Sequence, residues 1–469
     1  MVRRPHSCQT WASMIYYWDQ AIEVGGMKRI DRVRNQGVPD VAVQEDFGEP
    51  VAGGGLLHRR AFLRGGVAFA GATGALAVTA RDARSAADIA QGTPITMHTP
   101  GAPFSKYGVP SSHERQVVRA FTPNDRRPGT GASRTPLQML NGTITPNGLH
   151  FERHHNGIPD TNPNTHQLLI HGLVERPLFF GLEDLHRYPM ETHIRFIECS
   201  GNSGGQRGEE VSQRTAGELH GLVSCSEWTG VRLAVLLEEA GVDPSAKWIL
   251  AEGADAAGMS RSVPLEKCWE DAVIALYQNG EAIRPEQGHP MRLLLPGYEG
   301  NMSVKWLHRI EVTETATYTK DETSKYSDLL PSGKSLLFTF TQGVKSVITQ
   351  PSQGHKLPGA GTYQITGLAW SGAGRVREVE VSADGGTSWA EAALDGPVLP
   401  MALTRFRLPW AWTGDRLSIQ SRATDDAGNV QPTRDEWLSL YGPSQFYHYN
   451  AIQLWGVNSG GDVWNIHYA

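Results

Sequence analysis

Short apolar runs, rather than long amphipathic helices, mark the middle of the chain. Most of these runs are too short for a helix and are rich in aliphatic and aromatic residues, which predicts buried strands. They are HQLLIHGLV (residues 166–174), HIRFIEC (193–199), PMRLLLPG (290–297) and VKWLHRIEVTE (304–314). A longer run, GVRLAVLLEEAGV (230–242), has apolar residues at helical spacing and a glycine near its end, as helices often do. Together these runs predict an α+β domain.

The pattern changes after about residue 345. The runs in residues 361–372, 375–392 and 415–432 are β-branched and aromatic, and turn sequences separate them. Asp384-Gly385-Gly386 lies between two alternating segments and predicts a hairpin. Many short strands at this spacing are typical of an immunoglobulin-like β-sandwich.

We therefore predict three parts along the chain. Residues 1–85 form an N-terminal extension, residues 86–340 form the α+β domain, and residues 341–469 form the sandwich. Composition agrees with a globular protein, because 39% of the 469 residues are hydrophobic and 20% are charged. The net charge of −6 argues against nucleic acid as a partner, since phosphate binding needs a concentrated basic surface.

The N-terminal extension contains a segment that resembles a twin-arginine export signal. Arg59 and Arg60 precede a mildly apolar, Gly/Ala-rich stretch that runs to about residue 78, and small residues suited to cleavage follow at 80–87. The stretch is shorter than the ~20 apolar residues that span a bilayer, so we expect no stable membrane insertion. The alternative is a core helix that follows two arginines by chance. Met1 and Met27 both remain candidate start sites, and we expect a periplasmic protein.

Cys199 is the first candidate for chemistry. It stands between an apolar strand and the glycine-rich sequence SGNSGG, and a thiolate suits a heavy or redox-active metal. The glycines would let a large cofactor approach the backbone closely. The alternative is a small hydrophobic residue of the core, which is the usual role of a lone cysteine. The four cysteines form no CxxC or CxxCH pattern, so the sequence predicts neither a zinc ribbon nor a covalently attached haem.

Several motifs together resemble the sulfite oxidase family of molybdenum enzymes. They occur in the family's order along residues 145–440, and the C-terminal part resembles the family's dimerisation domain. The motifs are FERHH (151–155), HGLVERPLFFGLEDL (171–185), IECSGN (197–202), MSVKWLHRIEV (302–312), ITQPSQGHKL (348–357) and ATDDAGNVQP (423–432). The resemblance implies a sulfite-oxidase-type domain that binds molybdenum and molybdopterin, followed by the sandwich.

The resemblance also implies roles for individual residues. Cys199 would be the one protein ligand of molybdenum, with the other positions taken by the pterin dithiolene and by oxo or water groups. Arg153 matches an arginine at the substrate oxyanion site, and Tyr326 matches a tyrosine beside the metal. The residues implied to contact the cofactor are Arg153, His154, His155, Asp255, His289, Arg292, Ser303, Val304 and Lys305.

Some positions depart from the sulfite oxidase pattern. Gln287 stands where the family has a histidine, and Ser203-Gly204-Gly205 replaces a pair of arginines that animal sulfite oxidases carry after the cysteine. A further family arginine is replaced near Tyr441. Fewer fixed cations would weaken the binding of free sulfite dianion. CSGNSGG (199–205), HGLVSCSEWTGV (220–231) and GPSQFYHYNAIQLWG (442–456) instead resemble the sulfane dehydrogenases of the periplasmic Sox thiosulfate-oxidising system.

The resemblance implies a periplasmic oxidoreductase that oxidises the outer sulfur of a persulfide on a carrier protein's cysteine. Electrons would pass to a separate c-type cytochrome subunit, and the sandwich would join two copies of the chain within a heterotetramer. One alternative is a sulfite dehydrogenase that acts on free sulfite with the same metal and acceptor. A second alternative, from another functional class, is an exported scaffold without catalytic activity.

Overall fold

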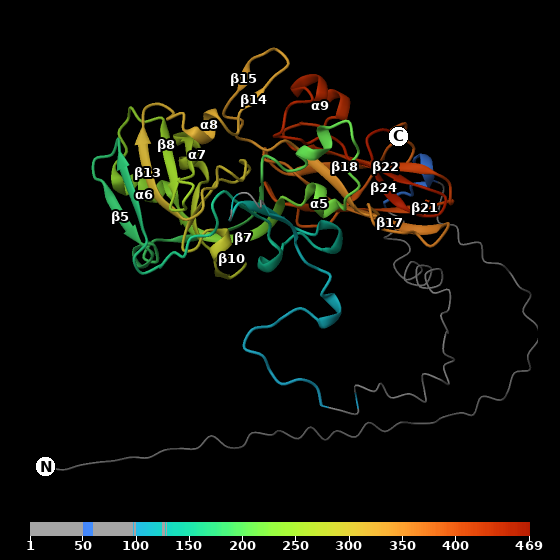
Figure 1. Ribbon diagram of the computed structural model, residues 1–469, viewed down its shortest axis with the longest axis horizontal. Coiled ribbons are helices and arrows are strands. Elements are labelled where there is room, and N and C mark those ends of the chain that lie inside the picture. Colours follow the sequence, from blue (N-terminus) through green and yellow to red (C-terminus); the bar gives the residue numbers. More distant parts are fainter. Residues whose placement is uncertain (1–49, 60–96, 98–99, 124–126, 128) are drawn as a thin grey trace, which may run out of the picture. The chain divides into compact units, whose positions relative to one another are not determined.

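The strands of the protein fall into two groups along the chain (Figure 1). The structure is a computed structural model that describes residues 50–59, 97, 100–123, 127 and 129–469. Cys8, Met27 and nearly all of the segment that resembles an export signal lie outside the described residues. In the described part of the chain, no helix is long and apolar enough to cross a membrane.

The first group contains two five-stranded sheets. One sheet has the order β5-β4-β13-β8-β9, and its pairs are antiparallel except for β4 with β13. The other has the order β11-β10-β7-β6, with β12 also paired to β10. The strands of the first sheet are β4 (Gln167–Gly172), β5 (Leu178–Gly181), β8 (Trp248–Gly253), β9 (Ser260–Pro264) and β13 (Leu307–Thr313). Those of the second are β6 (Met190–Glu198), β7 (Val223–Arg232), β10 (Val273–Gln278), β11 (Glu281–Ala282) and β12 (Arg292–Leu294).

Helices and smaller strands complete this first group. Helices α6 and α7 contribute buried apolar residues to one core with both sheets. The helices are α4 (Leu182–Leu185), α5 (Ala216–His220), α6 (Leu233–Ala240), α7 (Leu265–Glu270) and α8 (Lys320–Thr323). The remaining strands are β1 (Ala120–Pro123), β2 (Gly131–Arg134) and β3 (Glu152–His154), which form a three-stranded sheet, and β14 (Asp328–Leu329) with β15 (Ser335–Leu336).

The four predicted strands are confirmed, but the predicted helix over 230–242 is wrong at its start. Gly230 and Val231 pair with Ala275 and Ile274 of β10, so these positions belong to β7. The helix begins only at Leu233. It ends as expected, because Gly241 adopts a φ of 71°, in the left-handed region that glycine occupies at little cost.

The second group is a sandwich of two antiparallel sheets. One has the order β16-β17-β21-β20 and the other β19-β18-β22-β23-β24. Their facing sides bury Phe406, Trp410, Trp412 and Trp455 in a single core. The strands are β16 (Lys345–Gln350), β17 (Gly361–Trp370), β18 (Val376–Ser382), β19 (Ala390–Glu391), β20 (Ala393–Leu394), β21 (Thr404–Trp412), β22 (Leu417–Asp425), β23 (Leu454–Val457) and β24 (Val463–Ile466), and α9 covers Arg434–Tyr441. The predicted hairpin is confirmed, because β18 pairs with β19 across Asp384-Gly385-Gly386. The α+β class followed by a sandwich is confirmed, while the exact domain boundaries stay a prediction.

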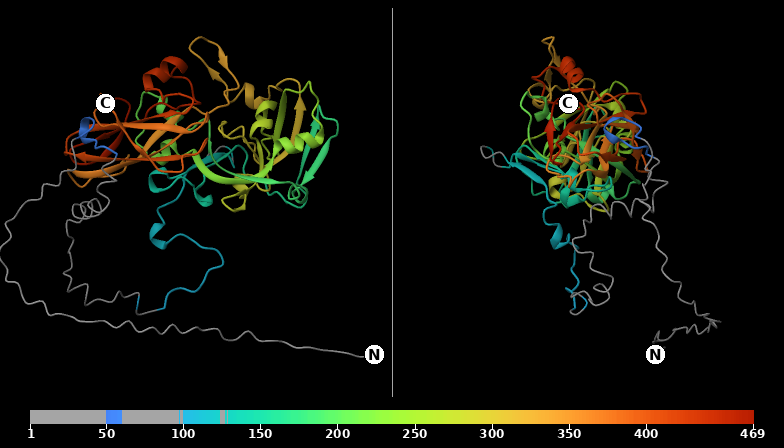
Figure 2. Two further views of the ribbon diagram at one scale, coloured as in Figure 1. Left: turned by 180° about the vertical axis from the view of Figure 1, so that it is seen from behind. Right: turned by 90° about the vertical axis from the view of Figure 1, so that its right-hand side faces the viewer.

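A short segment from the N-terminal extension packs on this sandwich. Residues 50–59, blue in Figures 1 and 2, lie against β21. Leu56 is 0% exposed within the sandwich core, and its backbone pairs with Trp410. The indole Nε1 of Trp410 donates a hydrogen bond of 2.7 Å to the carbonyl of Gly54, and Arg59 pairs with Glu391. The sequence just before the paired arginines therefore completes the apolar core of the C-terminal part.

The packing of Leu56 predicts a stability effect in the full-length chain. Leu56→Ala should lower the free energy of unfolding of the sandwich by about 2–5 kcal/mol, because it leaves a cavity in a filled core. Val51→Ala is the matched control, since Val51 belongs to the same segment and is 47% exposed. Guanidinium unfolding followed by tryptophan fluorescence measures the difference. Equal midpoints for Leu56→Ala and the unaltered chain would show that the segment does not pack in solution.

Candidate active site

Cys199 lies directly after β6, where the chain leaves the sheet. Its N–H donates a hydrogen bond of 2.9 Å to Leu222, and its carbonyl accepts one of 2.8 Å from Asn202, so the backbone on both sides of the thiol is held. Burial raises the pKa of the thiol, while the N–H of Gly201 and the nearby Arg153 act in the opposite direction. The half-buried thiol is therefore protonated at neutral pH until a metal displaces the proton.

The glycines after Cys199 accommodate another part of the chain. A Cβ at Gly201 would lie 2.9 Å from the ring of Phe446, and a Cβ at Gly204 would lie 2.6 Å from its carbonyl oxygen. Ser203 between them has a φ of 65°. The expectation that these glycines make room for a cofactor is therefore not what the structure shows at these two positions. They let the loop after α9 approach the cysteine.

The residue before the cysteine is a buried carboxylate. Glu198 accepts hydrogen bonds from Lys345 Nζ (3.1 Å), Trp370 Nε1 (2.7 Å) and Asn202 Nδ2 (2.9 Å). Lys345 and Trp370 belong to the sandwich part, and Lys345 Nζ also donates to Ser203 Oγ over 2.8 Å. Because a buried charge needs a partner of opposite sign, this group joins the two parts immediately beside Cys199.

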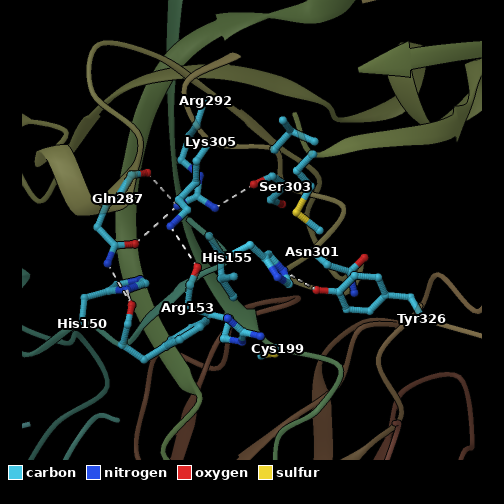
Figure 3. A pocket seen from close by; sticks show the side chains of 15 residues that line it. His150, Arg153, His155, Cys199, Gln287, Arg292, Asn301, Ser303, Lys305 and Tyr326 are labelled. Carbon is cyan, nitrogen blue, oxygen red and sulfur yellow. Dashed lines mark hydrogen bonds between the residues drawn. The ribbon is translucent and has the colours of Figure 1, made fainter. Parts of the chain in front are cut away.

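Two cavities meet at Cys199. The inner cavity has a volume of about 70 Å³, and the outer one has a volume of about 800 Å³. Figure 3 shows that the inner cavity is bordered by polar side chains from separate segments of the chain. Both cavities are lined by Arg153, His155, Cys199, Met259 and Tyr326. A group bound to the Cys199 sulfur therefore reaches both spaces.

His155 and Tyr326 form a pair at the junction of the cavities (Figure 3). His155 Nε2 lies 3.0 Å from the Tyr326 hydroxyl, and the guanidinium of Arg261 lies 5.0 Å from the centre of the Tyr326 ring. Burial, followed by the charge of Arg153, lowers the pKa of His155 to about 4. Burial also raises the pKa of Tyr326. At neutral pH the pair is therefore an uncharged imidazole beside an uncharged phenol.

Arg292 and Lys305 give the inner cavity its positive charge. Arg292 donates to the backbone carbonyls of Gln287 (3.0 Å) and Ser303 (2.9 Å) and to the side-chain Oε1 of Gln287 (3.5 Å). Lys305 Nζ donates to the carbonyls of Arg153 and Glu286 and lies 3.0 Å from His154 Nδ1. Among the described residues, neither cation forms an ion pair with a carboxylate. Burial lowers the pKa of Arg292 to about 9, and burial and Arg292 lower that of Lys305. An anion bound here would supply the missing opposite charge.

Three buried polar atoms that line the inner cavity have no hydrogen-bond partner. They are Nε2 of His150, Nε of Arg292 and Oδ1 of Asn301. Burial lowers the pKa of His150 to about 3, so its imidazole is neutral. Unsatisfied donors and acceptors are costly in a folded protein, so their concentration in one cavity indicates a polar ligand.

Most residues predicted from the sequence line the inner cavity, although their roles stay a prediction. Those that do are Arg153, His155, Cys199, Arg292, Ser303, Val304, Lys305 and Tyr326. His154, Asp255 and His289 are not among its lining residues. His154 Nδ1 lies 3.0 Å from Nζ of Lys305, which does line the cavity. His289 Nδ1 lies 3.2 Å from the carbonyl of Ile283. The Asp255 carboxylate lies 3.4 Å from the N–H of Met259, which does line the cavity.

Sequence reasoning missed several lining residues. His150 and Phe151 adjoin the FERHH motif, and Asn301 adjoins the SVK motif, so proximity to those motifs could have indicated them. Phe446 and Tyr447 line the outer cavity from the sandwich part, a few residues after Tyr441, the position near which a family arginine is replaced. The Tyr441 ring packs against Trp437, with 5.2 Å between the ring centres.

The expectation that fewer fixed cations surround the metal than in sulfite oxidases stays a prediction, but the outer cavity does contain cations. The outer cavity is lined by Arg134 in β2 as well as by Arg153 in β3, because these neighbouring strands share an edge of the site. Arg127, Lys320 and Lys325 add three further cations, and Asp321 is the carboxylate among the described residues that line it. The cations come from segments outside the cysteine loop, which is why the loop sequence did not reveal them.

Comparisons with known proteins agree with this arrangement. The family model described as "Oxidoreductase molybdopterin binding domain" matches residues 155–320, and that described as "Mo-co oxidoreductase dimerisation domain" matches residues 338–454. A solved structure of the sulfane dehydrogenase SoxCD from Paracoccus pantotrophus is 42% identical, with a TM-score of 0.78, and the likeness covers 81% of this chain and 100% of that chain. The chain belongs to the sulfite oxidase family of molybdopterin oxidoreductases.

Curated relatives in this family include the mitochondrial sulfite oxidases of Mus musculus and Homo sapiens. Each is 30% identical to this chain, over 66% and 67% of its length. The matches span 61% of the mouse protein and 62% of the human protein, so the chain covers less than two thirds of these relatives.

The residues of the site fit the molybdenum and molybdopterin of the sulfite oxidase family. The Cys199 thiol provides a soft ligand for the metal. Arg292, Lys305 and the Ser303 hydroxyl can hold the cofactor's phosphate, and the unpaired atoms of His150 and Asn301 can bond to polar atoms of the pterin. Among the described residues, no group of three or more His, Cys, Asp or Glu side chains is placed to hold a metal ion.

Cys199→Ser should abolish turnover while the fold stays intact, because a hydroxyl is a harder and poorer ligand than a thiolate. Cys225→Ala and Cys268→Ala are the matched controls, since both cysteines are fully buried and unpaired elsewhere in the same part. They should keep activity and lose only stability. Turnover of sulfite and of a cysteine persulfide with ferricyanide as acceptor, beside a circular dichroism spectrum, tests this. A fully active Cys199→Ser enzyme would contradict the role of Cys199 as metal ligand.

Proposed function

We propose that this protein is the molybdenum subunit of a periplasmic sulfane dehydrogenase. It oxidises the outer sulfur of a persulfide on a carrier protein's cysteine and passes the electrons to a c-type cytochrome subunit. The observation that carries this proposal is the likeness to the sulfane dehydrogenase SoxCD, which extends over 100% of that chain at 42% identity. The dimerisation-domain match over residues 338–454 supports a pair of these chains within the assembly.

The residues around the outer cavity suit a sulfur substrate. When bound, molybdopterin supplies the oxygen-transfer and redox chemistry. The neutral His155–Tyr326 pair lies where the outer cavity meets the inner one. It can donate a hydrogen bond to the substrate, or accept one from it, without adding charge. Arg153 is held by the carbonyls of Gly131 and His154 and can direct its remaining N–H groups toward the cavity. It thus provides a fixed cation for oxygens that gather on the substrate sulfur.

A second candidate function is a sulfite dehydrogenase that acts on free sulfite. The observation that favours it is the set of cations that line the outer cavity, because a dianion is attracted to such a surface. The two functions require the same metal site and differ in the substrate that enters the cavity. The turnover of free sulfite relative to that of a carrier persulfide therefore distinguishes them.

Arg153→Gln tests the role of the fixed cation. A persulfide carries a single charge spread over a large, polarizable sulfur. Negative oxygens accumulate only as oxidation proceeds, so Arg153 interacts most strongly with the substrate late in the reaction. The variant should slow complete oxidation about ten- to hundred-fold, equal to about 1.5–3 kcal/mol, with a smaller change in KM. Arg187→Gln, on the exposed surface, is the control. The number of electrons delivered to the acceptor per persulfide measures how complete the oxidation is. Turnover of free sulfite by the unaltered enzyme as fast as that of the carrier persulfide would favour the sulfite dehydrogenase instead.

Export by the twin-arginine route forms part of the proposal. A chain that must receive molybdopterin in the cytoplasm has to cross the membrane already folded, and the sequence around Arg59 and Arg60 resembles the signal for that route. Replacing Arg59 and Arg60 with lysines should leave folded, cofactor-loaded protein in the cytoplasm. Cell fractionation with molybdenum analysis measures this. Normal accumulation of that variant in the periplasm would contradict the route.

A further inference from the structure

The outer cavity has an aromatic wall made by a loop of the sandwich part. Phe446 and Tyr447 follow helix α9 and line the same cavity as Arg134 and Arg153 of β2 and β3. The Phe446 side chain is 47% exposed. The loop therefore presents apolar surface to whatever enters from solvent.

Contacts with the cysteine loop hold this wall in place. The N–H of His448 donates a hydrogen bond of 2.8 Å to the carbonyl of Ser200, next to Cys199. The His448 ring lies 3.3 Å from Glu299 on one side and 3.3 Å from Asp328 on the other. Burial opposes a positive charge there, but the two carboxylates raise the pKa of His448 overall. The loop is thus anchored to the molybdopterin-binding part by its backbone and by the His448 ring between two carboxylates.

The two rings are oriented by their neighbours. The guanidinium of Arg207 lies 5.1 Å from the centre of the Phe446 ring, and the rings of Phe446 and Tyr447 meet edge to face at 5.2 Å. Tyr447 lies 5.3 Å from Tyr326, which contacts His155. A continuous row of rings therefore leads from the surface to the metal site, and each ring is held by the next.

Cations also line the cavity. They are Arg127, Arg134, Lys320 and Lys325, with Asp321 as the carboxylate among the described lining residues. Such a surface attracts acidic partners from solution, whereas an aromatic wall disfavours ions that keep their hydration shell. Sulfane sulfur is polarizable and weakly hydrated, and sulfur makes favourable contacts with aromatic rings.

We propose that Phe446 and Tyr447 are specificity-determining residues that select a sulfur carried on a protein over a free, hydrated oxyanion. The carrier protein has an acidic surface, which the cations that line the cavity recognise. The inference rests on the proposed sulfane dehydrogenase function. It adds that the sandwich part, and not the molybdopterin-binding part alone, determines the substrate.

Two synthetic peptides test the proposal with the full holoenzyme. Each carries one cysteine persulfide between glycines, and the ends are glutamates in one peptide and glutamines in the other. With ferricyanide as acceptor, kcat/KM is measured for both peptides and for sulfite. The unaltered enzyme should prefer the glutamate peptide at low salt and lose this preference at high salt. Phe446→Ala should lower the ratio of peptide to sulfite kcat/KM at least ten-fold, and Phe446→Leu should lower it less.

Phe179→Ala in β5 is the matched control, because Phe179 is an exposed phenylalanine (61%) that lines neither cavity at Cys199. The peptide-to-sulfite ratio of kcat/KM and the molybdenum content of Phe179→Ala should equal those of the unaltered enzyme. The molybdenum content of Phe446→Ala should also equal that of the unaltered enzyme. An unchanged peptide-to-sulfite ratio in Phe446→Ala would overturn the selection by the aromatic wall while leaving the sulfane dehydrogenase function in place. An unaltered enzyme that oxidises sulfite but neither peptide would overturn that function itself.

Discussion

The buried ion pair between Glu198 and Lys345 is the constraint on which the site depends. Glu198 precedes the cysteine in the chain, and Lys345 belongs to the first strand of the sandwich. Breaking a buried pair by removing one partner costs about 3–5 kcal/mol, because a charge is left without compensation. The position of the Cys199 sulfur is therefore determined by both parts of the molecule, and an intact sandwich is a condition for a correctly placed thiol.

The same dependence explains the glycines that follow the cysteine. Gly201 and Gly204 have no side chains because the loop that carries Phe446 occupies that space. The loop in turn bonds to Ser200 and places His448 between Glu299 and Asp328. The sandwich part, which matches the dimerisation-domain model, thus contributes a wall of the active site. A change in this loop can alter substrate choice without touching the cofactor.

Much of the site could be predicted from local sequence, because Cys199, Arg153 and Lys305 stand in short motifs beside buried strands. The start of helix α6 could not, since the pairing of Gly230 with Ala275 is a contact between distant segments that outweighs a helical pattern. Arg134 and Tyr447 were missed for a related reason. Their place in the cavity depends on strand pairing and on a loop that is more than 200 residues from Cys199 in sequence. Leu56 was missed because its segment was assigned to a leader.

X-ray absorption at the molybdenum edge of the purified holoenzyme tests the central claim most directly, since it reports the atoms bound to the metal. Coordination by the Cys199 thiolate predicts one sulfur neighbour more than the two of a pterin dithiolene, and the loss of that one neighbour in Cys199→Ser. A holoenzyme whose metal shows only the two dithiolene sulfurs, unchanged by the substitution, would contradict the assignment of Cys199 as the protein ligand.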